Sequence, residues 1–134
     1  MADAISLKAG GNINPSVFVE LDATADATVI QGDGSTVLAF GVSGESTEDA
    51  PGLSGASSYH ASTGSEAVKV FGPGESCLLT AGAAVTRGAL LKSNASGQGV
   101  TATTGTYANA VAVESAGGSG ELIRVRVTDP VYVP

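Results

Sequence analysis

The side chains that could carry out covalent catalysis are few in this chain of 134 residues. Its single cysteine, Cys77, lies in the apolar run SCLLT, whereas its single histidine, His60, lies in a segment rich in Gly and Ser. A catalytic thiol requires a base beside it, and an internal disulfide requires a second cysteine. We therefore expect Cys77 to be a small buried hydrophobic side chain, and we expect the protein not to be an enzyme.

Acidic side chains are the other candidates, since paired carboxylates catalyse hydrolysis and clustered carboxylates bind metal ions. Asp22, Asp26 and Asp33 lack the alternating spacing of a calcium-binding loop, and each is explained as a turn residue. The chain also lacks a phosphate-binding GK[ST] loop, a G-x-S-x-G elbow and a His/Cys metal cluster. We expect no metal and no cofactor, although thirteen acidic residues leave a small hydrolase open as the least favoured alternative.

The charge of the chain is acidic and unevenly distributed. The net charge is −7, and residues 1–67 contain nine acids and one lysine, whereas residues 68–134 contain four acids and five bases. Direct binding of nucleic acid requires a basic patch with interleaved aromatic residues, so we exclude it. The asymmetry either orients docking on a partner through complementary potentials or is simply a solvated acidic face.

The composition favours short strands over helices. Nineteen glycines accompany many Ser, Thr and Ala residues, and only 4% of the residues are aromatic, so a core must be built from Val, Leu, Ile and Ala. Charged residues make up 14% of the chain, against about 25% in average soluble proteins, which predicts a surface partly covered in an assembly. Neither a membrane span nor a signal peptide is recognisable, so we expect synthesis in the cytoplasm and no membrane partner.

The first fourteen residues, MADAISLKAGGNIN, predict an extended arm before a single β-rich domain over residues 15–134. Ile5 and Leu7 alternate with polar positions until a pair of glycines interrupts the pattern. An arm with free backbone groups can add a strand to the sheet edge of a neighbouring protein. We therefore select Ile5, Leu7 and Lys8 as candidate interface residues, with a frayed terminus as the alternative.

Alternating apolar residues continue into the first half of the domain. One strand is expected to place Val17 and Val19 on one face and Phe18 on the other. Strands at about 27–31 and 36–43 are expected to form a hairpin, because the intervening Gly-Asp-Gly supplies the positive φ values of a tight turn.

Residues 44–64 form one long loop without periodicity. Tyr59 and His60 are the bulky side chains of this loop. They are candidate contact anchors for a partner, since tyrosine buries a large area at low entropic cost. The alternative is that they hold the loop on its own domain.

The second half of the chain is typical of short strands and tight turns. Strands are expected at about 67–71 and 75–80 around a Gly-Pro-Gly turn, then within the stretch 81–102, at 107–114 and at 121–127. In the last strand Arg124 and Arg126 share one face, opposite Ile123, Val125 and Val127. Two arginines in a base-poor chain are candidates to bind acidic groups of a partner or sister subunit, and cross-strand pairing within the chain is the alternative.

Several segments together resemble the small capsid cement, or head decoration, proteins of tailed bacteriophages. They are AFGVS at 39–43, YHA at 59–61, VKVFGPG at 68–74, AGAAVTRGALLKSNASGQGV at 81–100, AVAVE at 110–114 and GELIRVRV at 120–127. The resemblance covers roughly residues 36–127. Ala89 departs from it, because the family usually carries an acid after the turn glycine.

The resemblance implies an all-β fold, a small β-sandwich or β-barrel-like (β-tulip-like) domain of antiparallel strands. It further implies a structural protein of the virion, commonly a homotrimer, that binds the major capsid protein on the outer surface of the mature head near local threefold axes. There it would stabilise the shell against the pressure of packaged DNA. A glycan-binding or fibre-type β module on a virion is the alternative, although three tyrosines and no tryptophan offer few sugar-stacking platforms.

Overall fold

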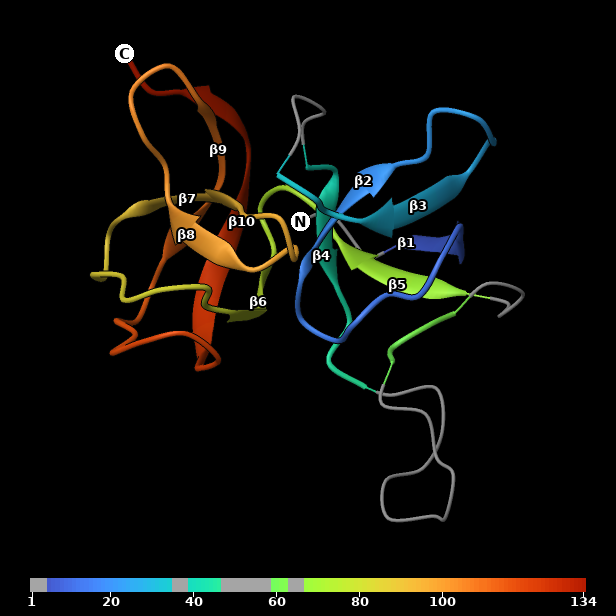
Figure 1. The fold of residues 1–134 in the computed structure, drawn as a ribbon, viewed down its shortest axis with the longest axis horizontal. Helices are drawn as coiled ribbons and strands as arrows, with labels where there is room; N and C mark the ends of the chain where they lie inside the picture. The colour runs from blue at the N-terminus through green and yellow to red at the C-terminus, as the bar shows by residue number, and fades with distance from the viewer. Residues whose placement is uncertain (1–4, 35–38, 47–58, 63–66) are drawn as a thin grey trace.

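The computed structural model describes residues 5–34, 39–46, 59–62 and 67–134, and these residues form ten β-strands (Figure 1). The strands build two units that lie side by side, a closed barrel from the first half of the chain and a five-stranded sheet from the second half. The predicted all-β class, with a barrel-like component, is confirmed. No helix long and apolar enough to cross a membrane occurs within the described ranges.

The barrel closes in the order β1-β3-β2-β4-β5. Val29, Val68 and Val70 are fully buried in its core together with Ile13, because branched side chains pack well on a pleated surface. Closure occupies both edges of every strand in this unit. The strands are β1 (Ile5–Ala9), β2 (Phe18–Leu21), β3 (Thr28–Gln31), β4 (Gly41–Ser43) and β5 (Val68–Phe71).

Of the arm expected at residues 1–14, residues 1–4 lie outside the described residues, and residues 5–14 are part of the barrel unit instead. β1 pairs in parallel with β3 and antiparallel with β5, so strands of the same chain occupy both of its edges. Leu7 is half-buried, Ala9 is 8% exposed, and Ile13 is fully buried and bridged to Ala61. The alternation correctly indicated extended backbone, and Leu7 packs against the core of the barrel.

Two of the expected hairpins are also absent from the described strands. β3 pairs with β1 and β2, whereas β4 pairs with β2 and β5, so β3 and β4 are not neighbours. The Gly-Pro-Gly segment at 72–74 connects β5 of the barrel to the second sheet, and the φ of 89° at Gly74 permits the reversal. In both segments a glycine directly follows the end of a strand, but a glycine turn does not specify which strands pair.

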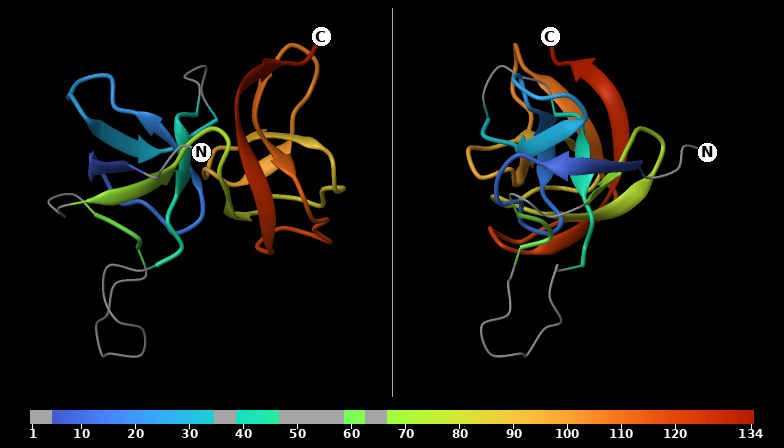
Figure 2. Two further views of the ribbon diagram at one scale, coloured as in Figure 1. Left: turned by 180° about the vertical axis from the view of Figure 1, so that it is seen from behind. Right: turned by 90° about the vertical axis from the view of Figure 1, so that its right-hand side faces the viewer.

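The second sheet has the strand order β6-β10-β9-β7-β8 (Figure 2). The expected hairpin within 81–102 is present as β7 and β8, and the two expected C-terminal strands pair antiparallel as β9 and β10. Leu79, Leu91 and Val125 are fully buried in the core of this unit. The strands are β6 (Ser76–Thr80), β7 (Leu90–Ser93), β8 (Gly99–Thr101), β9 (Tyr107–Ala112) and β10 (Leu122–Tyr132).

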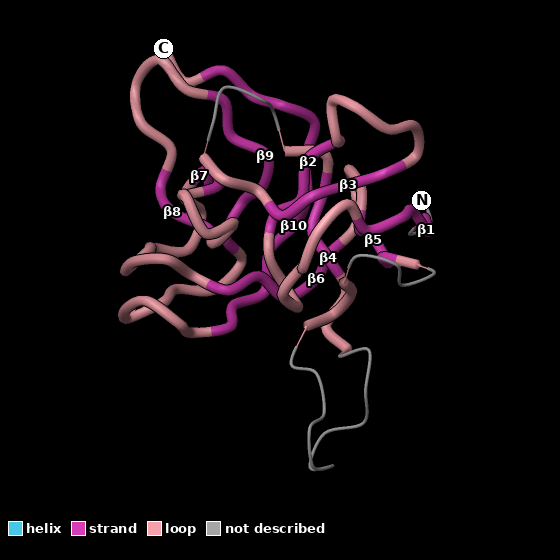
Figure 3. The backbone as a smooth tube through the Cα atoms, turned by 45° about the vertical axis from the view of Figure 1, so that its right-hand side comes forward, coloured by secondary structure: helices cyan, strands magenta, loops and turns pink. Residues whose placement is uncertain are grey.

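The two units are joined through β2, which is buried on both faces. Val19 belongs to the barrel core, whereas Phe18 is fully buried in the core of the second sheet. The Phe18 N–H also donates to the Gly97 carbonyl in the β7–β8 turn at 2.7 Å, so this turn lies against the barrel (Figure 3). The sequence predicted the alternation of Val19 and Phe18 but not the second core that covers Phe18.

Candidate functional site

The seven residues singled out from the sequence are not gathered into one site. They lie on β1 (Ile5, Leu7, Lys8), beside the barrel (Tyr59, His60) and on β10 (Arg124, Arg126). On β1 the Lys8 side chain is exposed, but its backbone N–H donates to the Ala27 carbonyl at 2.9 Å. Because the barrel is closed, β1 cannot add to the sheet of another protein without first leaving its own.

His60 holds its loop segment on the barrel. His60 is 8% exposed, its ring Nδ1 lies 2.6 Å from the Ser46 carbonyl oxygen, and its Nε2 accepts from the Lys69 N–H at 3.1 Å. A carbonyl only accepts and an N–H only donates, so the ring carries its proton on Nδ1. The His60 backbone N–H donates to Ile13 at 2.8 Å. Both ring nitrogens are therefore engaged with the chain itself, whereas Tyr59 is partly exposed beside it.

Cys77 is a buried core residue of β6, as expected. Its exposed fraction is 6%, and it pairs across the sheet with Val125. Burial raises the pKa of the Cys77 thiol to about 12, and the charges of Glu45 and Glu75 act in the same direction. A thiol that stays protonated at neutral pH is a poor nucleophile.

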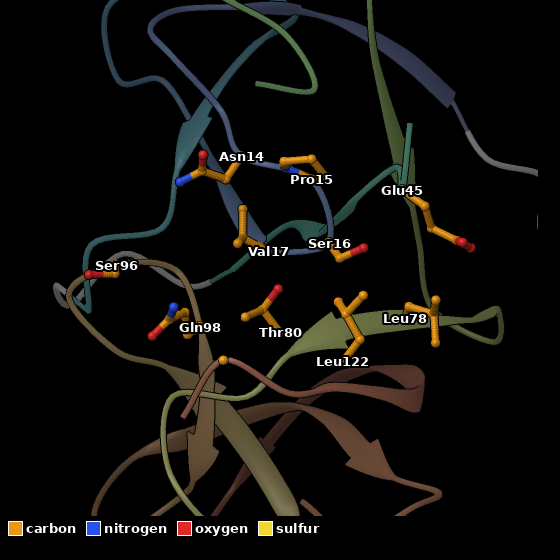
Figure 4. Close-up of a pocket in the computed structure, with 11 residues that line it drawn as sticks. Asn14, Pro15, Ser16, Val17, Glu45, Leu78, Thr80, Ser96, Gln98 and Leu122 are labelled. Carbon is orange, nitrogen blue, oxygen red and sulfur yellow. The ribbon is translucent and has the colours of Figure 1, made fainter. Parts of the chain in front are cut away.

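An open cleft of about 720 Å³ separates the barrel from the outer surface of β6 and β10 (Figure 4). One wall is the segment Asn14–Val17 with Glu45, and the other carries Leu78, Thr80 and Leu122. Its size falls in the range of ligand sites, but its polar and apolar side chains do not converge on one point.

Ser16 connects the two walls of the cleft. Its carbonyl accepts the Thr80 N–H at 2.7 Å, and its own N–H donates to the Gly44 carbonyl at 3.1 Å. Ser16 has a φ of 54°, a left-handed conformation that costs a non-glycine residue energy and that is retained only where its surroundings hold it. β6 is an edge strand of the second sheet. The bond from Thr80 to Ser16 therefore satisfies one backbone group at the end of the unpaired edge of β6. No motif in the sequence marks this junction.

Arg124 and Arg126 are exposed on the outer face of β10, while Ile123, Val125 and Val127 are buried on the inner face, so the predicted alternation is confirmed. Opposite Arg124 on β6 lies Leu78, and opposite Arg126 lie Ser76 and, on β9, Val111. No acid stands directly across the strands from either arginine in this register.

Sequence reasoning missed an exposed aromatic pair at the end of the second sheet. Tyr107 on β9 and Tyr132 on β10 are cross-strand partners, and their rings meet edge to face with centroids 5.3 Å apart. The side chains are 46% and 55% exposed, and Val131 beside them is 39% exposed. The pairing depends on the shift in the β9–β10 register between Val127 and Val131, which the sequence does not reveal.

Comparison with known proteins identifies a shared fold. The chain is similar to the solved structure of the head fiber gp8.5 N base in bacteriophage phi29, with a TM-score of 0.57 and 16% sequence identity. The match covers 96% of this chain and 95% of that chain, so it includes both the barrel and the second sheet. No family model matches the sequence, and no curated protein matches it.

Proposed function

We propose that the protein is a structural component of a tailed-bacteriophage virion, attached to the outer surface of the head and made in the host cytoplasm. The observation that carries this proposal is the fold shared over almost the whole length with the N base of a phage head fiber. It agrees with the sequence resemblance to head decoration proteins, which rests on segments distributed over both units. In this proposal the chain binds other proteins and catalyses no reaction.

The finer proposal is that of a capsid cement protein. A homotrimer near a local threefold axis would bind the major capsid protein and hold neighbouring subunits together against the pressure of packaged DNA. Three weak contacts made by one trimer reinforce each other, because each contact raises the effective concentration of the next. A surface with few charges also suits broad contact with a shell, and Leu122, Tyr132 and Val113 are each at least half exposed.

A fibre-type module on the head is the second candidate. It is favoured by the description of the phi29 protein as a head fiber base and by the exposed Tyr107–Tyr132 pair, which offers an aromatic surface to a glycan or to a further protein. Cement and fibre base differ in one measurable consequence, since only cement strengthens the shell on which it sits.

The test uses the purified chain and phage shells that lack it, in expanded and unexpanded forms. We expect co-sedimentation with expanded shells, and for a cement protein we also expect the bound shells to resist rupture at temperatures that open bare DNA-filled heads. Binding without any gain in rupture temperature would favour the fibre-type candidate. Absence of binding to both forms of shell would contradict attachment to the head.

A further inference from the structure

The outer face of β10 combines exposed apolar and basic side chains. Leu122, at the rim of the cleft that faces the barrel, is 57% exposed, and the exposed Arg124 and Arg126 follow it along the same face. Val113, next to β10, is 50% exposed, and its N–H donates to the Arg124 carbonyl at 2.9 Å. We refer to Leu122, Val113, Arg124 and Arg126 as the basic face. Apolar groups beside arginines are the composition that is enriched at protein interfaces.

The basic face is not neutralised by its own sheet. The cross-strand partners of the two arginines are Leu78, Ser76 and Val111, none of which carries a charge. Glu114 lies nearby, and its Oε1 accepts the backbone N–H of Arg124 at 2.8 Å; its single negative charge offsets at most one of the two arginines. The basic face is therefore a local positive surface on a protein whose net charge is −7.

The turn between β2 and β3 presents the opposite combination. Leu21 is 47% exposed at the end of β2, Asp26 is exposed, and the half-exposed Asp22 stands between them. The backbone N–H of Thr24, and then its hydroxyl, donates to Asp22 Oδ1 at 2.8 Å, and these bonds hold the pKa of Asp22 below its usual range. We refer to Leu21, Asp22 and Asp26 as the acidic tip.

The acidic tip and the basic face belong to different units, with the β2–β3 turn at the end of the barrel that points away from the second sheet and β10 on the side of the second sheet next to the barrel (Figure 1). They cannot meet within one chain. We infer that the acidic tip of one copy docks on the basic face of the next, so that copies associate head to tail. The contact pairs exposed leucines with each other and two carboxylates with two guanidinium groups, which suits Arg geometry.

A head-to-tail contact is heterologous, and it forms a ring when its rotation closes. The inference rests on the homotrimer of the proposed function and names the surfaces that would build it. It differs from the strand exchange expected of a free arm, because β1 is retained within each barrel.

The test reverses the charges of each surface separately and then of both together. The readout is the molar mass, measured by light scattering after size-exclusion chromatography. The wild-type chain should run as a closed oligomer, and Arg124→Glu/Arg126→Glu and Asp22→Lys/Asp26→Lys should each raise its dissociation constant at least about tenfold, since like charges then face each other. The chain carrying all four substitutions should recover the wild-type mass. Raising the salt concentration should weaken wild-type assembly.

A matched control is Thr101→Glu/Thr103→Glu, which adds two acids at exposed positions near the β8 edge of the same sheet. It should leave the mass unchanged, and far-UV circular dichroism should show that all variants are folded. A monomeric wild type, unaffected double variants, or a folded fourfold variant that stays dissociated would each overturn the inference. Binding of dissociated variants to expanded shells, measured in parallel, reports on head attachment separately.

Discussion

Placing a carboxylate on either side of β1 tests whether the N-terminal segment is a barrel strand or a free arm. Ser6 and Ala9 both lie on this strand, but Ser6 is exposed, whereas Ala9 is 8% exposed and packs with the barrel core. Ser6→Asp should change the free energy of unfolding by no more than about 0.5 kcal/mol, as surface substitutions usually do. Ala9→Asp places the same group against Val29 and its neighbours in the barrel core.

The magnitude follows from the ionisation of the new side chain. In the unfolded chain the carboxyl has a pKa near 3.9, so keeping it neutral inside the barrel at pH 7 costs about 4 kcal/mol. Burying it charged would cost more. Because its pKa in the folded chain is raised, the variant should be closest to wild type near pH 4 and should lose stability as the pH rises. Such a loss is a large part of the ~5–15 kcal/mol that stabilises a typical domain.

Urea unfolding followed by far-UV circular dichroism at pH 4, 5.5 and 7 measures these differences without requiring a tryptophan, which the chain lacks. Equal unfolding free energies for Ser6→Asp and Ala9→Asp at pH 7 would refute the placement of β1 in the barrel. An Ala9→Asp loss that does not depend on pH would refute the ionisation argument and leave only a steric one.

Two further variants test the core of each unit. The pKa of the buried Cys77 thiol is raised to about 12, so the stability that the protonated thiol contributes is complete below pH 9 and is lost between about pH 9 and 12. In urea titrations over that interval, wild type should therefore lose stability relative to Cys77→Ala. Unfolding free energies of the two proteins that change in parallel with pH would contradict the burial of the thiol. A Cβ at Gly41 would collide with the carbonyl oxygen of Phe71, whereas a Cβ at Gly11 would meet open space. Gly41→Ala should therefore lower the free energy of unfolding by about 1–3 kcal/mol, and Gly11→Ala should leave it nearly unchanged. Equal midpoints of thermal unfolding for the two variants would argue against the packing of β4 on β5.

Elements whose signal is local could be predicted from the sequence. The alternation of Ile123, Val125 and Val127 with two arginines determines which side of β10 is buried, because adjacent side chains of a strand point to opposite faces. The β7–β8 hairpin follows from the Asn/Ser/Gly turn between two apolar runs, and the Asn94 side chain accepts the backbone N–H groups of Ser96 and Gln98 within it at 2.9 Å.

Elements whose partners are distant in the chain could not be predicted. The parallel pairing of β1 with β3 and the separation of β5 from β6 depend on barrel closure, which no local pattern encodes. From the alternation alone, Phe18 is expected on the face of its strand opposite Val17 and Val19. In the structure a second core covers that face. The cleft was missed for the same reason, since its walls come together only through the relative placement of the two units.

The single crossing between the two units, at residues 72–74, affects how the chain folds as it is synthesised. The barrel is complete once β5 has been made, whereas the sheet that covers Phe18 and Val42 consists entirely of later residues. A barrel that closed during synthesis, at about 5–20 residues per second, would expose Phe18 until the later residues were made. Such an intermediate has exposed hydrophobic surface and is prone to association. Completion of the second sheet both finishes the fold and buries that surface.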